Sequence, residues 1–322
     1  MKRPALRHLA ENRNLLIGAA CSPETIEAEA DYRRVLAREF NCIVGENCMK
    51  FAYLHPEFRK FDFSHSRKLA EFARKHKMKL RGHTLVWHSQ LSDWLTSGSF
   101  TRTGMLDVLQ EHIHTVAGHF RGDVFAWDVV NEGLADEGGW RKESPWHQKI
   151  GPAYLEHAFR WAHEADPDAQ LFYNDYGMEL PGKKSDACYK LVSQLLRKGV
   201  PIHGVGLQFH LGAENRLDKR ACMANIRRFN KLGLTVHFTE MDMGMKKPIT
   251  DETRREQAEE YASRLQVALD APDVSAVLFW GFTDRHSWLP AFTKGEYNEG
   301  LIFDRDCRGK PAYRAIRAVL AE

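Results

Sequence analysis

The chain has few of the features that mark membrane, multidomain or nucleotide-binding proteins. Its 322 residues contain no hydrophobic run long enough to span a membrane, and no low-complexity or Pro/Ser-rich linker separates two domains. They contain neither a Gly-rich phosphate loop nor a cluster with the spacing of metal ligands. The sequence therefore predicts one globular domain over residues 1–322, with no metal and no cofactor.

Cysteine and excess charge are also scarce. The six cysteines show no zinc-ligand spacing and most lie in apolar surroundings, which favours free, buried thiols in a reducing compartment over a disulfide framework: Cys21, Cys42, Cys48, Cys188, Cys222 and Cys307. The net charge of +3 comes from interspersed charges, so we expect no nucleic-acid partner.

The amino-terminal region superficially resembles a secretion signal. Lys2 and Arg3 precede the apolar stretch 15–20, but Glu11, Asn12 and the residues beside them interrupt the approach to it. We therefore interpret this stretch as the first strand. If Met1 is the native start, the expected location is the cytoplasm, without membrane attachment; the oligomeric state stays open.

Strand-like and amphipathic helix-like segments alternate at the spacing of βα units. The expected strands are residues 15–20, 42–45, 79–84, 124–130, 170–174, 204–208, 235–239 and 276–280. Between them, apolar residues recur every three or four positions in segments such as 63–77, 185–198, 223–232 and 251–269. The alternation and the count of eight strands predict an α/β fold, a (β/α)8 TIM barrel.

Two carboxylates end apolar strand-like runs that lie far apart in the chain. Glu132 ends the run 123–132, which contains the fourth expected strand, and Glu240 ends the run 234–240, which contains the seventh. In an α/β barrel the carboxyl ends of the strands form the mouth where chemistry occurs, and a facing pair of carboxyls is what a glycosidase needs. A single strand-end Glu would more simply be a solvated loop residue or an ion-pair partner, so the surrounding residues decide.

Polar and aromatic side chains follow the other strands at the same expected end. They are Glu46, Asn47, Lys50, His83, Trp87, Asn131, Tyr173, Asn174, Gln208, His210, Asp242, Trp280 and Trp288. Sugars suit such a surface, because their C–H faces pack on aromatic rings while their hydroxyls bond to amides, imidazoles and carboxylates.

Four segments are similar to the signature segments of one enzyme family. Residues 83–88 (HTLVWH), 127–132 (WDVVNE), 173–176 (YNDY) and 239–242 (TEMD) resemble those of family 10 glycoside hydrolases, the endo-β-1,4-xylanases, and the resemblance runs in order from about residue 6 to residue 320. Met241, Phe209 and Gly133 depart from the usual pattern, but they leave every expected polar group in place and bear only on fine specificity.

The resemblance implies a role for each acid. Glu132 would be the acid/base and Glu240 the nucleophile of a retaining enzyme, with the carboxyls about 5–5.5 Å apart. A general acid needs a raised pKa, whereas a nucleophile must stay ionised, which hydrogen bonds favour. His210 would bridge Glu240 and Asp242, and Asn131 would reach the 2-hydroxyl of the attacked sugar.

The remaining polar and aromatic residues would bind xylan or xylo-oligosaccharides. The resemblance places Glu46, Asn47, Lys50, His83, Trp87, Gln208, Trp280 and Trp288 around the glycone, and Tyr173 and Asn174 towards the leaving group. Packing at the barrel rim is the alternative interpretation for Trp288 and Tyr173, and less so for Asn174.

Three functions therefore compete. A retaining endo-xylanase is favoured; a β-1,4-glucanase or a mixed xylanase/cellobiosidase on the same barrel is the alternative, and would differ in tolerating the hydroxymethyl group that xylose lacks. A non-catalytic sugar-binding barrel is disfavoured, because both acids are present.

Overall fold

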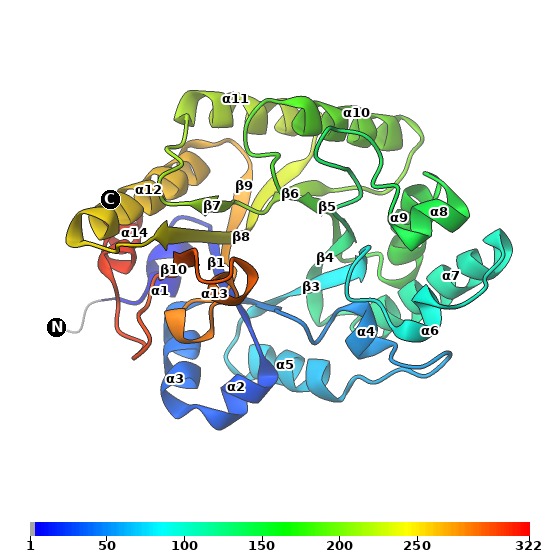
Figure 1. The fold of residues 1–322 in the computed structure, drawn as a ribbon, viewed down its shortest axis with the longest axis horizontal. Helices are drawn as coiled ribbons and strands as arrows, with labels where there is room; N and C mark the ends of the chain where they lie inside the picture. The colour runs from blue at the N-terminus through cyan, green and yellow to red at the C-terminus, as the bar shows by residue number, and fades with distance from the viewer. Residues whose placement is uncertain (1–3) are drawn as a thin grey trace.

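The computed structural model describes residues 4–322, and its centre is a closed ring of eight parallel strands (Figure 1). The strands are β1 (Leu16–Cys21), β2 (Cys42–Gly45), β3 (Lys79–Val86), β4 (Val124–Asn131), β5 (Gln170–Asp175), β6 (Gly204–Leu207), β8 (Thr235–Lys246) and β9 (Val274–Phe279). Each pairs with the next, and β9 pairs back to β1, which closes the ring. The predicted (β/α)8 barrel is confirmed.

Helices surround the strands on all sides in Figure 1. The longer ones are α3 (Ala30–Glu39), α5 (Ser64–Lys75), α7 (Arg102–His119), α9 (Tyr154–Ala165), α10 (Lys183–Arg197), α11 (Lys219–Asn230), α12 (Asp251–Asp270) and α14 (Pro311–Ala321). Shorter ones are α1 (Leu6–Glu11), α2 (Pro23–Ala28), α4 (Phe51–Leu54), α6 (Asp93–Thr96), α8 (Pro145–Ile150), α13 (Leu289–Phe292) and the 3-10 helix η1 (Asp284–His286). The four helical segments expected from periodicity are α5, α10, α11 and α12. Local sequence sets their ends: α12, for example, begins at a capping box between Thr250 and Thr253.

Most of the apolar core lies between the strands and these helices, whereas polar groups occupy part of the barrel interior. Arg81 and Asp128 form a buried ion pair there, and Arg81 Nη1 lies 2.8 Å from His237 Nδ1. The His237 ring in turn stacks on Phe172, with 4.2 Å between ring centroids. A charged pair is tolerated at this depth because each partner satisfies the other.

Strand β8 extends well beyond the barrel wall. It was expected to end at residue 239, but it continues to Lys246, because β7 (His210–Gly212) and β10 (Tyr297–Asn298) pair with its extension. Glu240 and Asp242 therefore lie within a hydrogen-bonded strand rather than in a loop.

Two further expectations concern cysteine and membranes. All six cysteines are free and buried. Over residues 4–322, no helix is long and apolar enough to cross a membrane.

Candidate active site

The first candidate acid, Glu240, lies on β8 at the mouth of the barrel and is 4% exposed. Its Oε1 accepts a hydrogen bond from Asn174 Nδ2 at 2.7 Å, and its Oε2 lies 3.1 Å from His210 Nε2. Burial alone would raise the pKa of Glu240, but the hydrogen bond from His210 and the imidazoles of His83 and His210 outweigh it and lower that pKa. The carboxylate is thus held ionised and oriented, as a nucleophile must be.

His210 forms the expected bridge between two carboxylates. Its Nδ1 lies 3.0 Å from Asp242 Oδ1, opposite the contact with Glu240. Burial would lower the pKa of His210, but Asp242 and Glu240 together raise it well above its ordinary value. Both carboxylates thus favour the protonated ring, which can donate one hydrogen bond to each of them. Asp242 is fixed in its turn, because Trp288 Nε1 donates to its Oδ2 at 2.7 Å.

The second candidate acid, Glu132, follows the last residue of β4. Its backbone is left-handed, with φ +54°, which is uncommon for a non-glycine residue. Trp87 Nε1 donates to its Oε2 at 2.8 Å, and Gln208 Nε2 donates to its Oε1 at 3.1 Å. The side chain stays 13% exposed, more than that of Glu240.

Side-chain amides connect the two acids across the mouth. Asn174 Nδ2, which donates to Glu240, also donates to Asn131 Oδ1 at 2.8 Å. Asn131 Oδ1 further accepts from Gln208 at 3.2 Å, and Asn131 Nδ2 lies 3.3 Å from Glu132 Oε1. The two carboxylates therefore belong to one continuous hydrogen-bonded network.

A glycine makes room for this network. A Cβ added at Gly206 on β6 would lie 2.1 Å from Asn174 Oδ1 and 2.9 Å from Thr239. Only glycine lets the amide of Asn174 approach β6 so closely.

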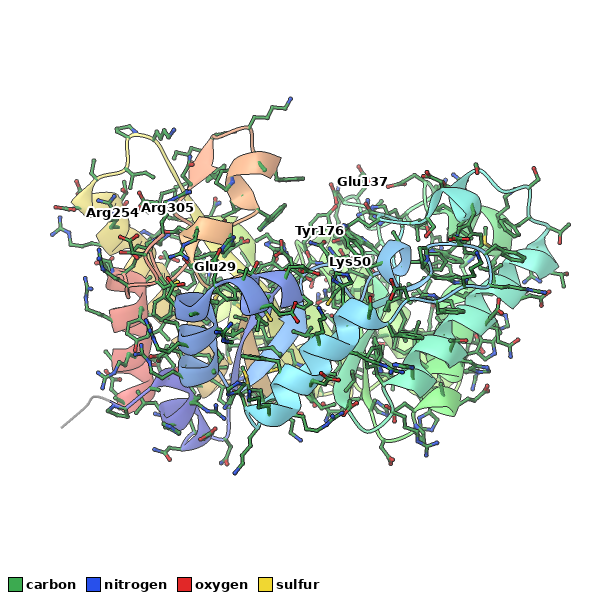
Figure 2. All side chains as sticks on the ribbon, turned by 90° about the horizontal axis from the view of Figure 1, so that it is seen from below. Glu29, Lys50, Glu137, Tyr176, Arg254 and Arg305 are labelled. Atoms are coloured by element: carbon green, nitrogen blue, oxygen red, sulfur yellow. The ribbon has the colours of Figure 1, made fainter. Side chains whose placement is uncertain are left out.

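On one side of the acids, Lys50 forms a cluster with Asn47, Gln90 and Trp87, called the Lys50 cluster below. Its Nζ donates to Asn47 Oδ1 at 3.1 Å and to Gln90 Oε1 at 2.6 Å, and lies 4.9 Å from the ring centroid of Trp87. Burial lowers the pKa of Lys50, opposed by Glu240, Glu46 and Glu132, while burial raises the pKa of Glu46. Figure 2, turned by 90° from Figure 1, shows Lys50 and Tyr176 towards the same end of the barrel.

Trp280 lies between the Lys50 cluster and the histidines beside Glu240. Its ring lies 5.7 Å from Lys50 Nζ, 5.0 Å from the His83 ring and 6.4 Å from the His210 ring. Trp288 packs edge-on to His210, with 5.0 Å between centroids. His83 Nδ1 is fixed at 2.9 Å from Asp128 Oδ2 inside the barrel. Predicted residues from the ends of seven of the eight barrel strands, β2, β3, β4, β5, β6, β8 and β9, thus meet around one site.

Two of the predicted sugar contacts need correction. Tyr173 and Asn174 have no exposed surface, so neither side chain can touch a sugar in this structure. Tyr173 points away from the barrel interior, into the outer core, and its hydroxyl donates to Asp175 Oδ2 at 2.7 Å. The prediction that Tyr173 binds substrate is therefore wrong, and Asn174 acts on Glu240 instead.

Sequence reasoning missed two residues of this site. Gln90 donates to Asn47 Oδ1 at 3.1 Å and accepts from Lys50, and Arg141 donates to the backbone carbonyl of Glu132 at 2.8 Å. Gln90 follows the HTLVWH segment by two residues, so its proximity could have been suspected. Arg141 lies in an irregular segment with no comparable signal.

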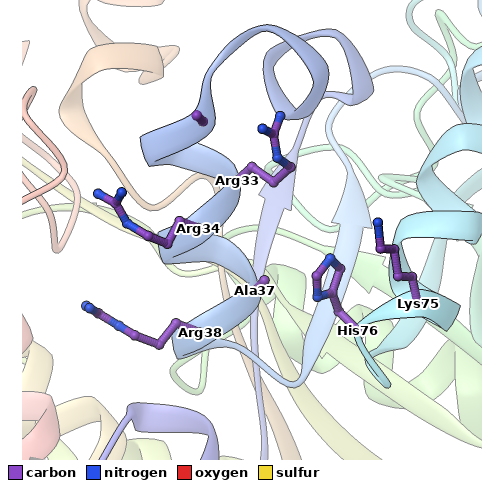
Figure 3. A pocket seen from close by; sticks show the side chains of 7 residues that line it. Arg33, Arg34, Ala37, Arg38, Lys75 and His76 are labelled. Carbon is purple, nitrogen blue, oxygen red and sulfur yellow. The ribbon is translucent and has the colours of Figure 1, made fainter. Parts of the chain in front are cut away.

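Two further features concern metal ligands and a hollow away from the acids. Within residues 4–322, no group of three or more His, Cys, Asp or Glu side chains could hold a metal ion. A hollow of about 560 Å³ on the outer helices is bordered by Arg33, Arg34, Arg38, Lys75 and His76. Figure 3 shows Arg34 and Arg38 pointing away from Lys75 and His76, so these cations do not converge on one point.

Comparisons with known proteins agree with this geometry. The family model for glycosyl hydrolase family 10 matches residues 5–319. Endo-1,4-beta-xylanase B of Thermotoga neapolitana is 44% identical over 98% of this chain and 92% of its own length. The structure of xylanase 10B from Thermotoga petrophila RKU-1 in complex with xylobiose is 44% identical and superposes with a TM-score of 0.96, covering 99% of this chain and 98% of that one. The structure of an intracellular xylanase from Thermoanaerobacterium saccharolyticum is 37% identical, with a TM-score of 0.91 and 98% of both chains covered. This chain belongs to glycosyl hydrolase family 10.

Proposed function

We propose that this protein is a retaining endo-1,4-β-xylanase in which Glu240 is the nucleophile and Glu132 the acid/base. The observation that carries the assignment is the contrast between the two acids. Both acids receive hydrogen bonds on both oxygens, but Glu240 is the more buried of the two and has a lowered pKa, because one of its oxygens contacts the His210 imidazole. Glu132 is more exposed and contacts the indole of Trp87 and the amide of Gln208. The three relatives compared above are all described as xylanases, which supports the same activity.

The reaction follows in two steps. A Glu240 oxygen attacks the anomeric carbon of the bound xylose while the bond to the departing sugar breaks and Glu132 gives its proton to the leaving oxygen. Glu132 then takes a proton from a water, which attacks the same carbon and releases Glu240, so the product keeps the β configuration. His210 and Asn174 hold Glu240 in place before the reaction, so little reorganisation is needed.

Asn131 would contribute through the sugar that is attacked. Its Oδ1 already accepts from Asn174 and Gln208, and one N–H of its amino group faces Glu132 Oε1 at 3.3 Å, so the second N–H is the part available to the 2-hydroxyl. That contact strengthens as the ring becomes oxocarbenium-like, and so lowers the barrier instead of merely tightening binding.

The glycone would lie against Glu46, Asn47, Lys50, His83, Trp87, Trp280 and Trp288. Lys50 and the three tryptophans leave little room for a hydroxymethyl group on the attacked ring, and pocket size of this kind discriminates by ~1–3 kcal/mol. The substrates are therefore xylan or xylo-oligosaccharides. Aryl xylobiosides should be cleaved faster than aryl cellobiosides; equal efficiency on both would favour the glucanase alternative.

Two measurements test the mechanism. Proton NMR of the first product released from xylo-oligosaccharides should detect the β-anomer, and initial appearance of the α-anomer would overturn the proposal. Glu240→Gln should abolish turnover of every substrate. Glu132→Ala should still cleave dinitrophenyl xylobioside, whose leaving group departs without a proton, but not xylotetraose.

We also propose that the protein acts in the cytoplasm on xylo-oligosaccharides. Six free, buried cysteines are what a reducing compartment permits, and the relative from Thermoanaerobacterium saccharolyticum is described as intracellular. Fractionation of the producing cells tests this: activity found mainly in the medium would contradict it.

A further inference from the structure

The backbone around Glu132 is held by one residue, Arg141, through two side-chain hydrogen bonds and one main-chain hydrogen bond. Arg141 Nε donates to the carbonyl oxygen of Glu132 at 2.8 Å, its backbone N–H donates to that of Gly133 at 3.1 Å, and its Nη2 donates to that of Leu134 at 3.0 Å. Three consecutive carbonyls thus share one partner. Arg141 itself is 9% exposed.

The residue whose carbonyl Arg141 binds, Glu132, has an unfavourable backbone conformation. Glu132 has φ +54°, a region that side chains other than Gly, Asn and Asp seldom occupy and that persists only where the surroundings enforce it. On its amino side, the N–H of Glu132 donates to the carbonyl of Asn174 at 2.9 Å, which continues the sheet. On its carboxyl side, Arg141 supplies the matching constraint.

Arg141 is anchored in its turn. Leu134 and Trp140 form an antiparallel bridge, so the chain returns to the β4 end just before Arg141. The guanidinium also donates to Tyr176 Oη at 2.9 Å and to Glu143 Oε1 at 2.9 Å, and Tyr176 donates to Asp136 Oδ1 at 2.6 Å. The planar fork of arginine makes these contacts together, which a lysine cannot do.

We propose that Arg141 is a positioning residue for acid/base catalysis. By fixing the carbonyls of residues 132–134 it fixes the direction in which the Glu132 side chain leaves the backbone, and so the distance from the Glu132 carboxyl to the leaving oxygen. This inference rests on the proposed role of Glu132. Arg141 does not touch the glycone side of the site, so its loss should leave nucleophilic attack by Glu240 intact.

The test compares two substrates that differ in their need for a proton. Misplacement of a catalytic group by about 1 Å costs on the order of 10²-fold in rate. For Arg141→Met we expect kcat/KM on xylotetraose to fall about 100-fold, and kcat/KM on dinitrophenyl xylobioside, which reports the glycosylation step, to fall less than about 3-fold. The kcat/KM of Arg141→Lys on xylotetraose should lie between the values for wild type and Arg141→Met.

Arg264→Met is the matched control. Arg264 has no exposed surface, bonds to Glu260 and to the carbonyl of Asn215, and lies on α12 away from both acids. Its loss should change kcat/KM on both substrates by the same factor. Thermal unfolding of each variant shows whether it is folded. If Arg141→Met does not fold, the comparison of the two substrates is made with Arg141→Lys.

The outcomes separate the inference from the proposed function. Suppose that Glu132→Ala shows the leaving-group dependence, but that both Arg141 variants lower kcat/KM by the same factor on xylotetraose and on dinitrophenyl xylobioside. The positioning role is then refuted. If Glu132→Ala itself shows no leaving-group dependence, the acid/base assignment fails first.

Discussion

The sharpest prediction about stability concerns His55, a histidine buried without a hydrogen-bond partner. The side chain has no exposed surface, and within residues 4–322 neither ring nitrogen has a hydrogen-bond partner. Its ring packs against Phe61 and Trp94, with centroids 4.0 and 4.8 Å away. Burial lowers the pKa of His55 to about 4. The folded protein therefore holds a neutral imidazole where the unfolded chain would take up a proton.

The sign and the size of the effect follow from linkage. Below the unfolded-state pKa of about 6.5, the unfolded chain binds more protons than the folded one, so stability falls as the pH falls. The contribution of His55 is complete above pH 6.5, declines between pH 6.5 and 4, and is constant below pH 4. A pKa lowered from 6.5 to about 4 corresponds to about 3 kcal/mol.

The perturbation is His55→Leu, which keeps an apolar side chain of similar size. The backbone carbonyl of His55 accepts from Ser92 and Trp94 and is unaffected. Reversible denaturant unfolding measures the free energy of unfolding at each pH. Between pH 7.5 and pH 4, this free energy should fall by about 3 kcal/mol more for wild type than for His55→Leu. His8→Gln, at an exposed histidine, should follow the wild-type curve. Parallel curves for wild type and His55→Leu would refute the reasoning.

Three other predictions concern the site, the thiols and a buried ion pair. His210→Asn should lower kcat by about 10²-fold or more with little change in KM, because Glu240 loses the cation that holds it ionised and oriented; a change confined to KM would contradict this. The folded protein should react slowly with a thiol reagent, since burial raises the pKa of Cys42 and Cys48 to about 12, and unfolding without reductant should release all six thiols; recovery of fewer would indicate a disulfide. Lys310→Met should destabilise the fold by about 3–5 kcal/mol, because it leaves the buried carboxylate of Asp284 without its partner at 2.7 Å, and Asp284→Asn in the same chain should recover part of the loss, as measured by denaturant unfolding.

The barrel was predictable because its signals are local and repeated. The barrel strands are short, largely apolar runs, and several of the segments between them show helical periodicity, so all eight strands could be located to within a few residues at their starts. The extension of β8 to Lys246 could not be predicted in the same way. It exists because β7 and β10, which are distant in sequence, pair with it, and such pairing leaves no periodic signal.

The site shows the same division. Glu132, Glu240, His210 and Asp242 could be placed because each follows or extends a strand in a recognisable segment. The error at Tyr173 was avoidable, since side chains alternate along a strand and Asn174 next to it points into the barrel. Arg141 could not have been found, because its role depends on a chain reversal at Leu134 and Trp140 that brings it back to the end of β4.

The extended β8 strand has a consequence for how this enzyme could be altered. Glu240 and Asp242 belong to a strand that is paired on both sides, so replacing or inserting residues there would shift the carboxylate relative to the anomeric carbon. Residues 135–139 are different, because they form the tip of a short hairpin whose base is fixed by Leu134, Trp140 and Arg141. Within that tip, Asp136 accepts a hydrogen bond from Tyr176, and a Cβ added at Gly138 would lie 2.7 Å from the carbonyl oxygen of Lys183. Libraries that leave both acids in place therefore belong at Glu137 and Gly139, which are exposed.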